Sequence, residues 1–392
     1  MSNEDVDVLI IGAGIMGAGV AQAAAAAGYS VRILEQTGIA SGTSSRSSKL
    51  IHGGLRYLES AQFTLVRECL AERALLLKLA PHLVKLKPFH IPIYEHTTRR
   101  PWQIGSGLTL YALLGGLNKD ARFQRLPRAQ WGTLDGLTTN GLQRVFRYYD
   151  AQTDDAALTQ AVIRSAQSLG AELIMPARFT AAEIDHDGVT VHYDHHNASH
   201  QCRAHLLINA GGPWANHILQ HVTPAVPTLE MELVQGTHII VDSQLQQGLY
   251  YLEAPKDRRA VFALPWQNKL MVGTTETFYA GDPRDVHPLT EEEDYLLDVL
   301  SHYFPAHRHL SRSDIASSFA GLRVLPKATG SAFSRSRETV FHPDNLLTPR
   351  LFTLYGGKLT AYRATAAKLM QRLKHVLPQR TPLADTRTLP LQ

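Results

Sequence analysis

Cysteine is scarce in this sequence: Cys69 and Cys202 are the only two among 392 residues. They lie far apart and in no CxxC spacing, which excludes a disulfide framework and a cysteine-rich metal site and fits a reducing compartment. Long hydrophobic runs are also missing, because no stretch reaches 18 apolar residues, so we expect no helix that crosses a membrane. Residues 1–7 are polar and lead directly into a strand-like segment, so we expect no signal peptide and a cytoplasmic protein.

A large excess of one charge is missing as well. The 39 Lys and Arg residues and the 35 Asp and Glu residues give a formal net charge of +4. That excess is too small for a dedicated nucleic-acid binder, although local basic clusters remain able to bind phosphates or anionic lipid. Hydrophobic residues make up 44% and charged residues 19%, as in ordinary globular proteins, and the length allows two or three domains.

The first 35 residues predict a βαβ unit. An apolar run, the motif Gly12-x-Gly14-x-x-Gly17, an alanine-rich segment and a second apolar run follow one another within residues 7–34. The first glycine permits a tight turn, the second lets a pyrophosphate approach the backbone, and the third brings the helix close to the strand. Glu35 ends the second run, where it would accept hydrogen bonds from ribose hydroxyls and repel a 2′-phosphate. FAD or NAD is therefore favoured over NADP.

The rest of the chain alternates helices and strands, but its middle changes character. Helices are expected at 61–79, 154–169, 290–304 and 361–376. Strands are expected at 172–175, 189–193, 205–209, 238–242, 249–252, 260–264 and 269–273. The last four strands are short and closely spaced, which indicates an antiparallel sheet. Dinucleotide-type segments at both ends of the chain indicate that this sheet belongs to a domain inserted into another.

Residues 42–59, GTSSRSSKLIHGGLRYLE, are dense in hydroxyls and glycines, which suits donation to a pyrophosphate and contact with a flat ring. This segment resembles the signature of FAD-dependent glycerol-3-phosphate dehydrogenases, of the D-amino-acid-oxidase-like flavoprotein superfamily. Other motifs of that family have counterparts in the same order: LLINAGGPW at 206–214, QGTH at 235–238, PW at 265–266, GTTE at 273–276, GLRVLP at 321–326 and YGGKLTAYR at 355–363. The resemblance covers roughly residues 5–375.

The resemblance implies an α/β fold, with a Rossmann-like FAD-binding domain and an inserted, mostly antiparallel β-sheet substrate domain. We expect residues 1–85, 145–225 and 315–392 to form the FAD-binding domain. Residues 86–144 and 226–314 would form the substrate domain, which covers the face of the flavin.

FAD is the cofactor that the resemblance implies, and its contacts are expected in the glycine motif, at Glu35 and in the matched motifs. The expected cofactor-binding residues are Gly12, Gly14, Ile15, Met16, Gly17, Glu35, Thr43, Ser44, Ser45, Ser47, Ser48, Lys49, Leu50, Gly53, Gly54, Ala210, Gly211, Trp214, Gly321, Gly357, Lys358, Leu359 and Thr360. No metal is expected.

The same resemblance implies a cluster of cations that holds a phosphate dianion, a task for which guanidinium groups are well suited. The expected substrate-binding residues are Arg56, Tyr57, Arg323, Arg335, Lys358 and Thr360. Arg337 stands two residues after Arg335, so the register of that assignment stays open.

The expected catalytic residues are His238, His52 and Arg323. Either histidine has the pKa of a proton acceptor near neutrality, and either could instead be a hydrogen-bonded structural residue. His238 is preferred, because it begins a strand expected to face the substrate.

The activity that the resemblance implies is oxidation of sn-glycerol 3-phosphate to dihydroxyacetone phosphate. A hydride would pass from C2 to flavin N5, and the electrons would go on to a quinone. Two alternatives stay open: a related oxidase or dehydrogenase of an amino acid or 2-hydroxy acid, and a flavin-binding subunit without turnover of its own. One arginine suits a carboxylate, whereas three or more cations suit a phosphate. Contact with the inner face of the cell membrane and oligomer formation also stay open.

The sequence departs from the family pattern at several places. Glu276 replaces the usual Asp, Ala361 replaces the second Thr of the closing motif, and the order Val324-Leu325-Pro326 differs from the usual Pro-Leu. The sequence also ends soon after the last expected helix, where typical members continue into a helical domain. We expect that difference to affect oligomerisation, membrane docking and electron delivery more than hydride chemistry.

Five histidines gather in a short polar region: His186, His192, His195, His196 and His200. They lie along an expected hairpin, and no pair has the helical spacing of a metal motif, so we interpret them as a solvated tip. The sequon at 197–199 carries no meaning without secretion.

Residues 102–117, WQIGSGLTLYALLGGL, form the most apolar segment outside the FAD motifs. We expect a buried helix of the substrate domain. The alternative is a partly exposed helix near a membrane surface, flanked by Arg99, Arg100 and Lys119.

Overall fold

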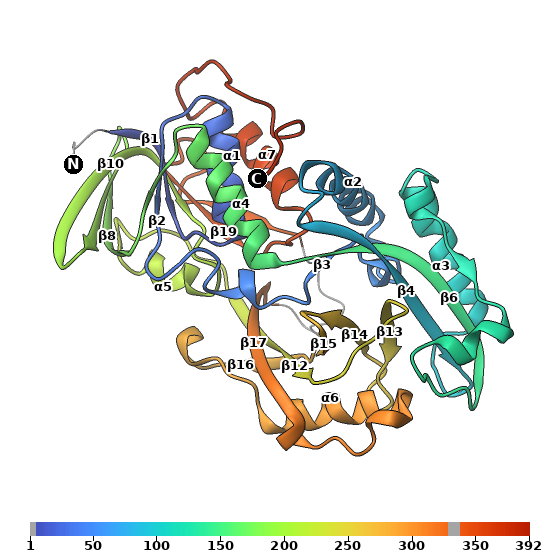
Figure 1. Ribbon diagram of the computed structural model, residues 1–392. Helices are drawn as coiled ribbons and strands as arrows, with labels where there is room; N and C mark the ends of the chain where they lie inside the picture. The colour runs from blue at the N-terminus through green and yellow to red at the C-terminus, as the bar shows by residue number, and fades with distance from the viewer. Residues whose placement is uncertain (1–4, 328–337) are drawn as a thin grey trace.

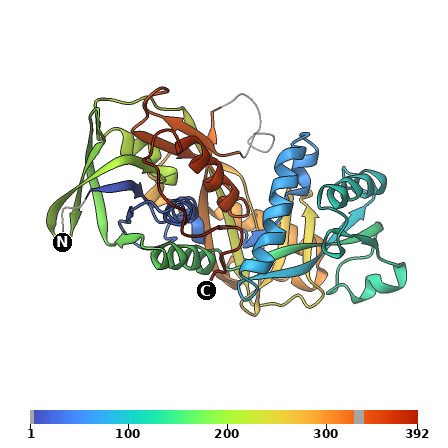
Figure 2. The same ribbon diagram turned by 90° about the horizontal axis from the view of Figure 1, so that it is seen from above.

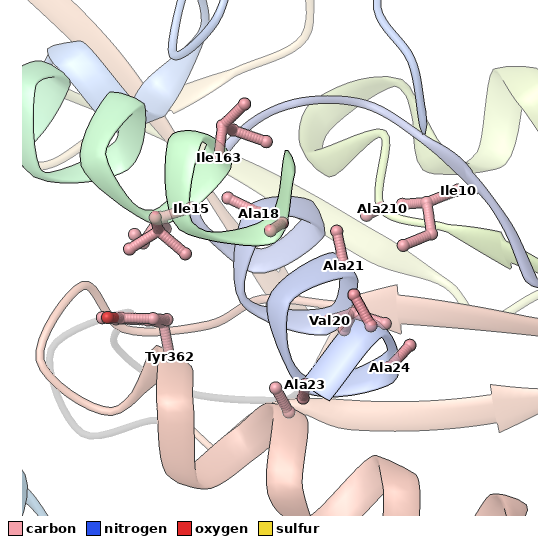
Figure 3. Close-up of a cluster of buried hydrophobic side chains, with 14 of the residues drawn as sticks. Ile10, Ile15, Ala18, Val20, Ala21, Ala23, Ala24, Ile163, Ala210 and Tyr362 are labelled. Atoms are coloured by element: carbon pink, nitrogen blue, oxygen red, sulfur yellow. The ribbon is translucent and has the colours of Figure 1, made fainter. Parts of the chain in front are cut away.

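The computed structural model describes residues 5–327 and 338–392 (Figure 1). The chain begins with the predicted βαβ unit, made of β1 (Val6–Ile11), α1 (Ile15–Ala26) and β2 (Val31–Leu34). Helix α1 is buried almost all round, because its small side chains let α4 and α7 approach closely. At Gly19 a Cβ would lie 2.7 Å from the ring of Tyr362, and Figure 3 shows this cluster.

The first sheet contains nine strands in the order β11-β8-β9-β10-β1-β2-β7, with β19 also paired to β10 and β18 to β19. Strands β19, β10, β1, β2 and β7 run parallel, and the hairpin β8–β9 extends β10 in antiparallel fashion. The further strands are β7 (Glu172–Ile174), β8 (Ala177–Ile184), β9 (Val189–His195), β10 (Ala198–Asn209), β11 (Val222–Thr223), β18 (Val340–Pro343) and β19 (Leu351–Tyr355). The carboxyl ends of parallel strands lie at one edge, where such folds place their ligands.

Helices from distant parts of the sequence cover this sheet: α4 (Asp155–Ser168), α5 (Ala215–Leu219) and α7 (Tyr362–Leu373). Asp154 caps α4 by accepting a hydrogen bond from Ala157 N, as its acidic start predicts. The chain after α7 returns to the start of the molecule, where Arg380 pairs with Asp7 at 2.8 Å.

The second sheet contains ten strands in the order β16-β12-β15-β14-β13-β4-β6-β3, with β17 paired to β12 and β5 to β6. Its pairings are antiparallel except for β13 with β4. The strands are β3 (Leu50–Ile51), β4 (Val84–Tyr94), β5 (Gln124–Arg125), β6 (Leu142–Thr153), β12 (Met231–Val241), β13 (Leu249–Glu253), β14 (Ala260–Trp266), β15 (Lys269–Gly273), β16 (Thr277–Tyr279) and β17 (Ile315–Pro326). Helices α2 (Phe63–Leu79), α3 (Pro101–Leu114) and α6 (Thr290–Tyr303) accompany it. The expected fold class, a parallel nucleotide-binding sheet with a mostly antiparallel second sheet, is confirmed.

Two long strands that adjoin the expected domain boundaries lie in the second sheet. They are β6, which contains residues 145–153, and β17, which consists of residues 315–326. The division into two domains, with its boundaries, stays a prediction. Sequence patterns miss such strands because β17 pairs with β12, more than 70 positions away.

The expectation of a buried helix at 102–117 is wrong. Helix α3 forms there, but Trp102 is 70% exposed and Leu113 is 55% exposed, and only Leu108, Tyr111 and Ala112 of the helix are buried. Figures 1 and 2 place α3 at the end of the molecule opposite to β8 and β10. Within the described residues, no helix combines the length and apolarity needed to cross a bilayer.

Candidate active site

A cavity of about 1120 Å³ is lined by residues of both sheets. The carboxyl ends of β1, β2 and β10 and the turn after β19 open onto it, as do β12 and β17 of the second sheet. Most of the expected cofactor residues border this cavity, although they come from segments up to 348 positions apart, from Gly12 to Thr360. The fold therefore brings cofactor residues that are far apart in the sequence together in one cavity.

The glycine motif forms one wall of the cavity. Gly12 has a φ of +101°, and a Cβ there would lie 2.8 Å from the carbonyl oxygen of Ala210. At Gly17 a Cβ would lie 2.0 Å from Gly12 O, so the turn and the start of α1 close only with glycine at these positions. This bare backbone at a helix N-terminus suits a pyrophosphate.

Glu35 ends β2 on the same wall. Its Oε2 accepts a hydrogen bond from Ala13 N at 2.8 Å, and its Oε1 accepts one from Thr37 N at 2.9 Å. The carboxylate is thereby fixed beside the glycine turn with acceptor capacity left for ribose hydroxyls. The residues present fit an adenine dinucleotide, because the turn leaves room for phosphates and the carboxylate stands at the ribose position.

The hydroxyl-rich segment expected to contact FAD is tied to three other elements. Ser44 Oγ accepts a hydrogen bond from Ile15 N at 2.9 Å, and Thr43 Oγ1 donates one to Leu322 O of β17 at 2.8 Å. Asp155, the first residue of α4, is fully buried, and it accepts hydrogen bonds from Ser47 Oγ at 2.6 Å and from Lys49 Nζ at 2.7 Å. These contacts hold the segment against the glycine motif.

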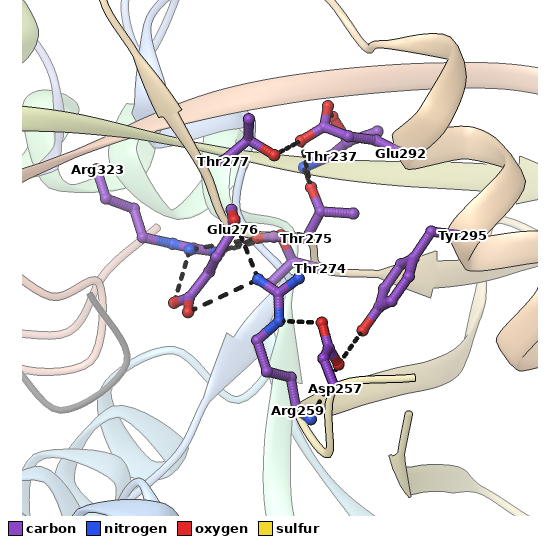
Figure 4. A network of polar contacts seen from close by, with 10 residues as sticks. All are labelled: Thr237, Asp257, Arg259, Thr274, Thr275, Glu276, Thr277, Glu292, Tyr295 and Arg323. Carbon is purple, nitrogen blue, oxygen red and sulfur yellow. Dashed lines mark hydrogen bonds and ion pairs between the residues drawn. The ribbon is translucent and has the colours of Figure 1, made fainter. Parts of the chain in front are cut away.

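Arg323 lies on β17 at the end of the cavity beneath the second sheet, and Figure 4 shows its contacts. Its Nη1 is 3.1 Å from Glu276 Oε1, and its Nη2 donates to Thr274 Oγ1 at 3.0 Å. A Cβ at Gly236 would lie 2.5 Å from Arg323 Nη2, so this glycine makes room for the guanidinium. Glu276 stands where the family pattern has Asp, and it still provides a carboxylate that pairs with Arg323.

His238 lies on β12 next to this cluster. Its Nε2 is 2.9 Å from Ser48 Oγ, and its ring stacks on Phe319 with centroids 4.9 Å apart. Burial and, to a smaller extent, the charges of Arg323 and Lys49 together lower the pKa of His238 to about 3. The imidazole is therefore neutral at physiological pH, but its pKa lies well below the near-neutral value that is expected of a proton acceptor.

His52 lies on the other side of the hydroxyl-rich segment, beside the closing motif. Its backbone N–H donates to Thr360 Oγ1 at 3.1 Å. Burial and, to a smaller extent, the charges of Lys358 and Arg56 together lower the pKa of His52 to about 3. Lys358 Nζ lies 3.8 Å from the ring centroid of Tyr57. This end of the cavity is therefore positively charged.

The expected site residues separate into three groups. Those that line the cavity are Gly12, Gly14, Ile15, Met16, Glu35, Thr43, Ser44, Ser47, Ser48, Leu50, His52, Tyr57, Ala210, Gly211, Trp214, His238, Gly321, Arg323, Gly357, Lys358, Leu359 and Thr360. Those of the described residues that lie behind the lining are Gly17, Ser45, Lys49, Gly53, Gly54 and Arg56. Arg335, with its alternative Arg337, lies outside the described residues. The roles of all of them stay predictions.

Sequence reasoning missed a buried network under this site. The Tyr111 hydroxyl donates to Asp150 Oδ2 at 2.7 Å and accepts a hydrogen bond from Gly53 N at 2.8 Å. Arg73 Nη1 pairs with the same carboxylate. Burial raises the pKa of Asp150, and the charge of Arg73 opposes that shift. No local pattern signals this network, because its members come from α2, α3, β6 and the loop after β3.

The expected histidine-rich hairpin is β9–β10. The rings of His195 and His196 lie 4.0 Å apart at its tip. Within the described part of the chain, no three His, Cys, Asp or Glu side chains are grouped so as to hold a metal ion.

Comparisons with known proteins agree with this geometry. Residues 7–383 match the family described as FAD dependent oxidoreductase. The chain is 36% identical over 384 residues to D-erythritol 1-phosphate dehydrogenase of Brucella abortus, covering 96% of this chain and 75% of that one. It is 38% identical over 383 residues to glycerol-3-phosphate dehydrogenase of Pseudomonas aeruginosa, covering 95% and 72%.

Solved structures share the architecture. Glycerol-3-phosphate dehydrogenase of Bacillus halodurans, determined with FAD, aligns with a TM-score of 0.76 at 26% identity over 100% of this chain and 68% of that one. Glycine oxidase of Geobacillus kaustophilus aligns with a TM-score of 0.72 at 20% identity over 98% and 99%, a likeness of fold alone.

Proposed function

Because this chain belongs to the family of FAD dependent oxidoreductases, we propose that it oxidises a phosphorylated polyol, with sn-glycerol 3-phosphate as the first candidate. The residues around the glycine motif would hold FAD, which would supply the acceptor for the hydride that leaves C2 of the substrate, and the product would be dihydroxyacetone phosphate. The protein's own residues must hold the phosphate, orient the C2–H bond and accept the hydroxyl proton.

The observation that carries this proposal is that cationic side chains of the matched motifs stand on the cavity wall. Arg323 and Lys358 border the cavity that the glycine motif also lines, and the charge of Arg56 acts on His52 close by. A phosphate dianion suits several fixed cations, whereas a carboxylate is satisfied by one. The cluster therefore supports a phosphorylated substrate over an amino acid or a 2-hydroxy acid.

We assign the hydroxyl proton to His238. Its neutral imidazole presents Nε2 to Ser48, whose side chain borders the cavity. The alternative acceptor, His52, also lines the cavity, and its pKa is lowered to the same value of about 3, so charge does not separate the two histidines. We prefer His238 because its Nε2 lies 2.9 Å from Ser48 Oγ, on the cavity wall that also carries Arg323.

An anaerobic titration of the FAD-loaded protein tests the proposal. The substrates are glycerol 3-phosphate, D-erythritol 1-phosphate, glycine, D-alanine and lactate, and the readout is loss of flavin absorbance near 450 nm. We expect reduction by the phosphorylated polyols only, and the ratio of their kcat/KM values decides between the three-carbon and four-carbon substrate. Reduction by an amino acid or lactate would overturn the proposal, and FAD that no substrate reduces would indicate a flavin-binding subunit.

The electron acceptor that we propose is a membrane quinone, reached through contact of α3 with the lipid surface. The outer face of α3 exposes Trp102 and Leu113, and Arg100 and Arg122 are exposed nearby in sequence. Apolar side chains with basic neighbours are typical of a helix that lies in the interface of an anionic bilayer.

Vesicle binding tests this contact. We expect the protein to sediment with phosphatidylcholine vesicles that contain phosphatidylglycerol, and Trp102→Ser/Leu113→Ser to abolish sedimentation. The matched control is Leu346→Ser/Leu347→Ser, because these leucines are 90% and 91% exposed but lie in the β18–β19 loop of the first sheet. Equal losses in both double variants would contradict the assignment to α3. Reduction of a short-chain quinone, compared with hydrogen peroxide formation in air, identifies the acceptor.

A further inference from the structure

A buried carboxylate lies behind the Arg323 cluster, outside the cavity lining. Glu292, on the first turn of α6, is 5% exposed. Its Oε1 accepts hydrogen bonds from Thr275 Oγ1 and Thr277 Oγ1, both at 2.7 Å. Its Oε2 accepts further hydrogen bonds from Gln235 Nε2 and Thr237 Oγ1, both at 2.6 Å. Four side chains thus converge on one carboxylate.

The surroundings of Glu292 keep it ionised. Burial by itself raises the pKa of this carboxyl, but the hydrogen bonds from the threonines and Gln235 outweigh burial, and the pKa is lowered. The carboxylate also accepts a hydrogen bond from Leu289 N at the N-terminus of α6, where the helix dipole favours negative charge.

The four donors belong to the two segments that position the candidate anion site. Gln235 and Thr237 lie on β12, directly before His238. Thr275 and Thr277 flank Glu276: Thr275 lies in the turn between β15 and β16, which carries the partners of Arg323, and Thr277 is the first residue of β16 (Figure 4). Thr237 N also donates to Thr275 Oγ1 at 2.9 Å.

We infer that Glu292 is a positioning residue for the anion site, an inference that rests on the proposed function. It clamps the turn at 273–277 onto β12 and thereby fixes Thr274 and Glu276, the two side chains that orient the guanidinium of Arg323. A neutral amide at position 292 keeps the shape but accepts hydrogen bonds at only one atom. Some of the hydrogen bonds that attach the turn to β12 through residue 292 are then lost, and Arg323 loses the orientation that a phosphate requires.

Glu292→Gln and a control one residue away test the inference in the FAD-loaded protein. Glu293→Gln removes the same charge from the same helical turn, but Glu293 contacts Ser318 of β17 at 2.6 Å and none of the four clamp donors. Binding of inorganic phosphate is measured by isothermal titration calorimetry. We expect the Kd of Glu292→Gln to rise at least about 10-fold and that of Glu293→Gln to stay within about 2-fold of the unmodified protein.

Kinetics and a second variant separate positioning from general destabilisation. With the polyol phosphate, Glu292→Gln should raise KM more than it lowers kcat, while FAD content stays unchanged. If Glu292→Gln does not fold, Thr277→Val removes one of the four donors and should raise the phosphate Kd by a smaller factor. Unchanged phosphate binding in the folded variant, or equal weakening in the Glu293→Gln control, would overturn the inference.

The proposed function and this inference fail in different ways. Phosphate binding that depends on Glu292, in a protein whose FAD no phosphorylated polyol reduces, would refute the proposed reaction and leave the clamp standing. An unmodified protein that binds no phosphate would refute the clamp as a device for anion binding, whatever substrate reduces the flavin.

Discussion

Replacing Arg323 by alanine should lower kcat/KM for the phosphorylated polyol by about 10²- to 10⁴-fold while FAD stays bound. The guanidinium borders the cavity and is held by Glu276 at 3.1 Å and Thr274 at 3.0 Å. A fixed guanidinium can donate two charge-assisted hydrogen bonds to a phosphate, each worth about 1.5–3 kcal/mol. Their loss corresponds to about 3–6 kcal/mol, which gives the stated range.

The carboxylate of Glu276 adds to this loss. It is nearly buried, and in Arg323→Ala it would face the substrate phosphate without the charge that now neutralises it. The double variant Arg323→Ala/Glu276→Gln should therefore recover part of the activity, by about 10-fold or less. Recovery of this kind indicates that electrostatic repulsion, rather than loss of fold, caused part of the defect.

The assay is anaerobic stopped-flow reduction of the flavin at a series of substrate concentrations, with FAD content measured from absorbance. Arg258→Gln is the comparison variant, because Arg258 lies outside the cavity lining and contacts His96 O at 2.7 Å and Glu253 at 3.7 Å, away from the turn that holds Arg323. We expect it to change kcat/KM by less than about 5-fold. An Arg323→Ala protein with unchanged kinetics, or an equal defect in both variants, would refute the assignment of Arg323 to the phosphate.

Three further outcomes follow from burial and close packing. Gly17→Ala should yield a colourless protein, because its Cβ would lie 2.0 Å from a backbone oxygen, whereas Gly107→Ala, with no atom within 4 Å, should stay yellow. The pKa of His238 is lowered to about 3 in the folded protein, whereas in the unfolded chain it is near 6.5, so between these pH values the unfolded chain binds one proton more and stability falls as pH decreases. From pH 7 to pH 5 the free energy of unfolding should fall by about 2 kcal/mol through this residue. Urea unfolding of His238→Gln should show a fall that is smaller by that amount. Leu391→Ala, at a position 3% exposed, should lower the free energy of unfolding by about 2–4 kcal/mol, and Leu383→Ala, at a position 63% exposed, by less than about 0.5 kcal/mol.

The βαβ unit could be predicted because its determinants are local. Close packing at Gly12 and Gly17, burial along β1 and the carboxylate at Glu35 all act within 35 residues. The start of α4 at Asp154 is local in the same sense, since a side-chain cap reaches only three residues ahead. Motifs of this kind leave a readable pattern.

Strand β12 shows why the bounds of other elements could not be predicted from the sequence. The prediction begins at residue 238, but the strand begins at Met231, and its first half contains Gln235 and Thr237, which are almost completely buried. Polar residues at buried positions contradict an apolar alternation. Glu292 accepts their hydrogen bonds and so stabilises their burial. Because Glu292 lies more than 50 positions later, the pattern of neighbouring residues does not indicate this partner.

Helix α3 shows a different limit. Its composition is apolar enough to predict burial, yet composition does not say whether another element covers the helix. Only the side of α3 that carries Tyr111 reaches the buried network around Asp150, and the side that carries Trp102 faces outward. The sequence therefore shows that this helix is apolar, but it does not show which of its apolar side chains are exposed.

The two sheets contribute different kinds of groups to the cavity, and this difference affects which substrate can bind. The first sheet offers the cofactor mostly backbone groups and glycines, which many sequences can supply, and a chain only 20% identical has the same fold. In the proposed function, the second sheet offers the substrate particular side chains, above all Arg323, whose place depends on the β12–β17 register and on the turn that Glu292 contacts. Substitutions at these few positions should therefore change the substrate without disturbing FAD. We expect identity at residues 276, 292 and 323 to predict activity on phosphorylated polyols better than overall identity does.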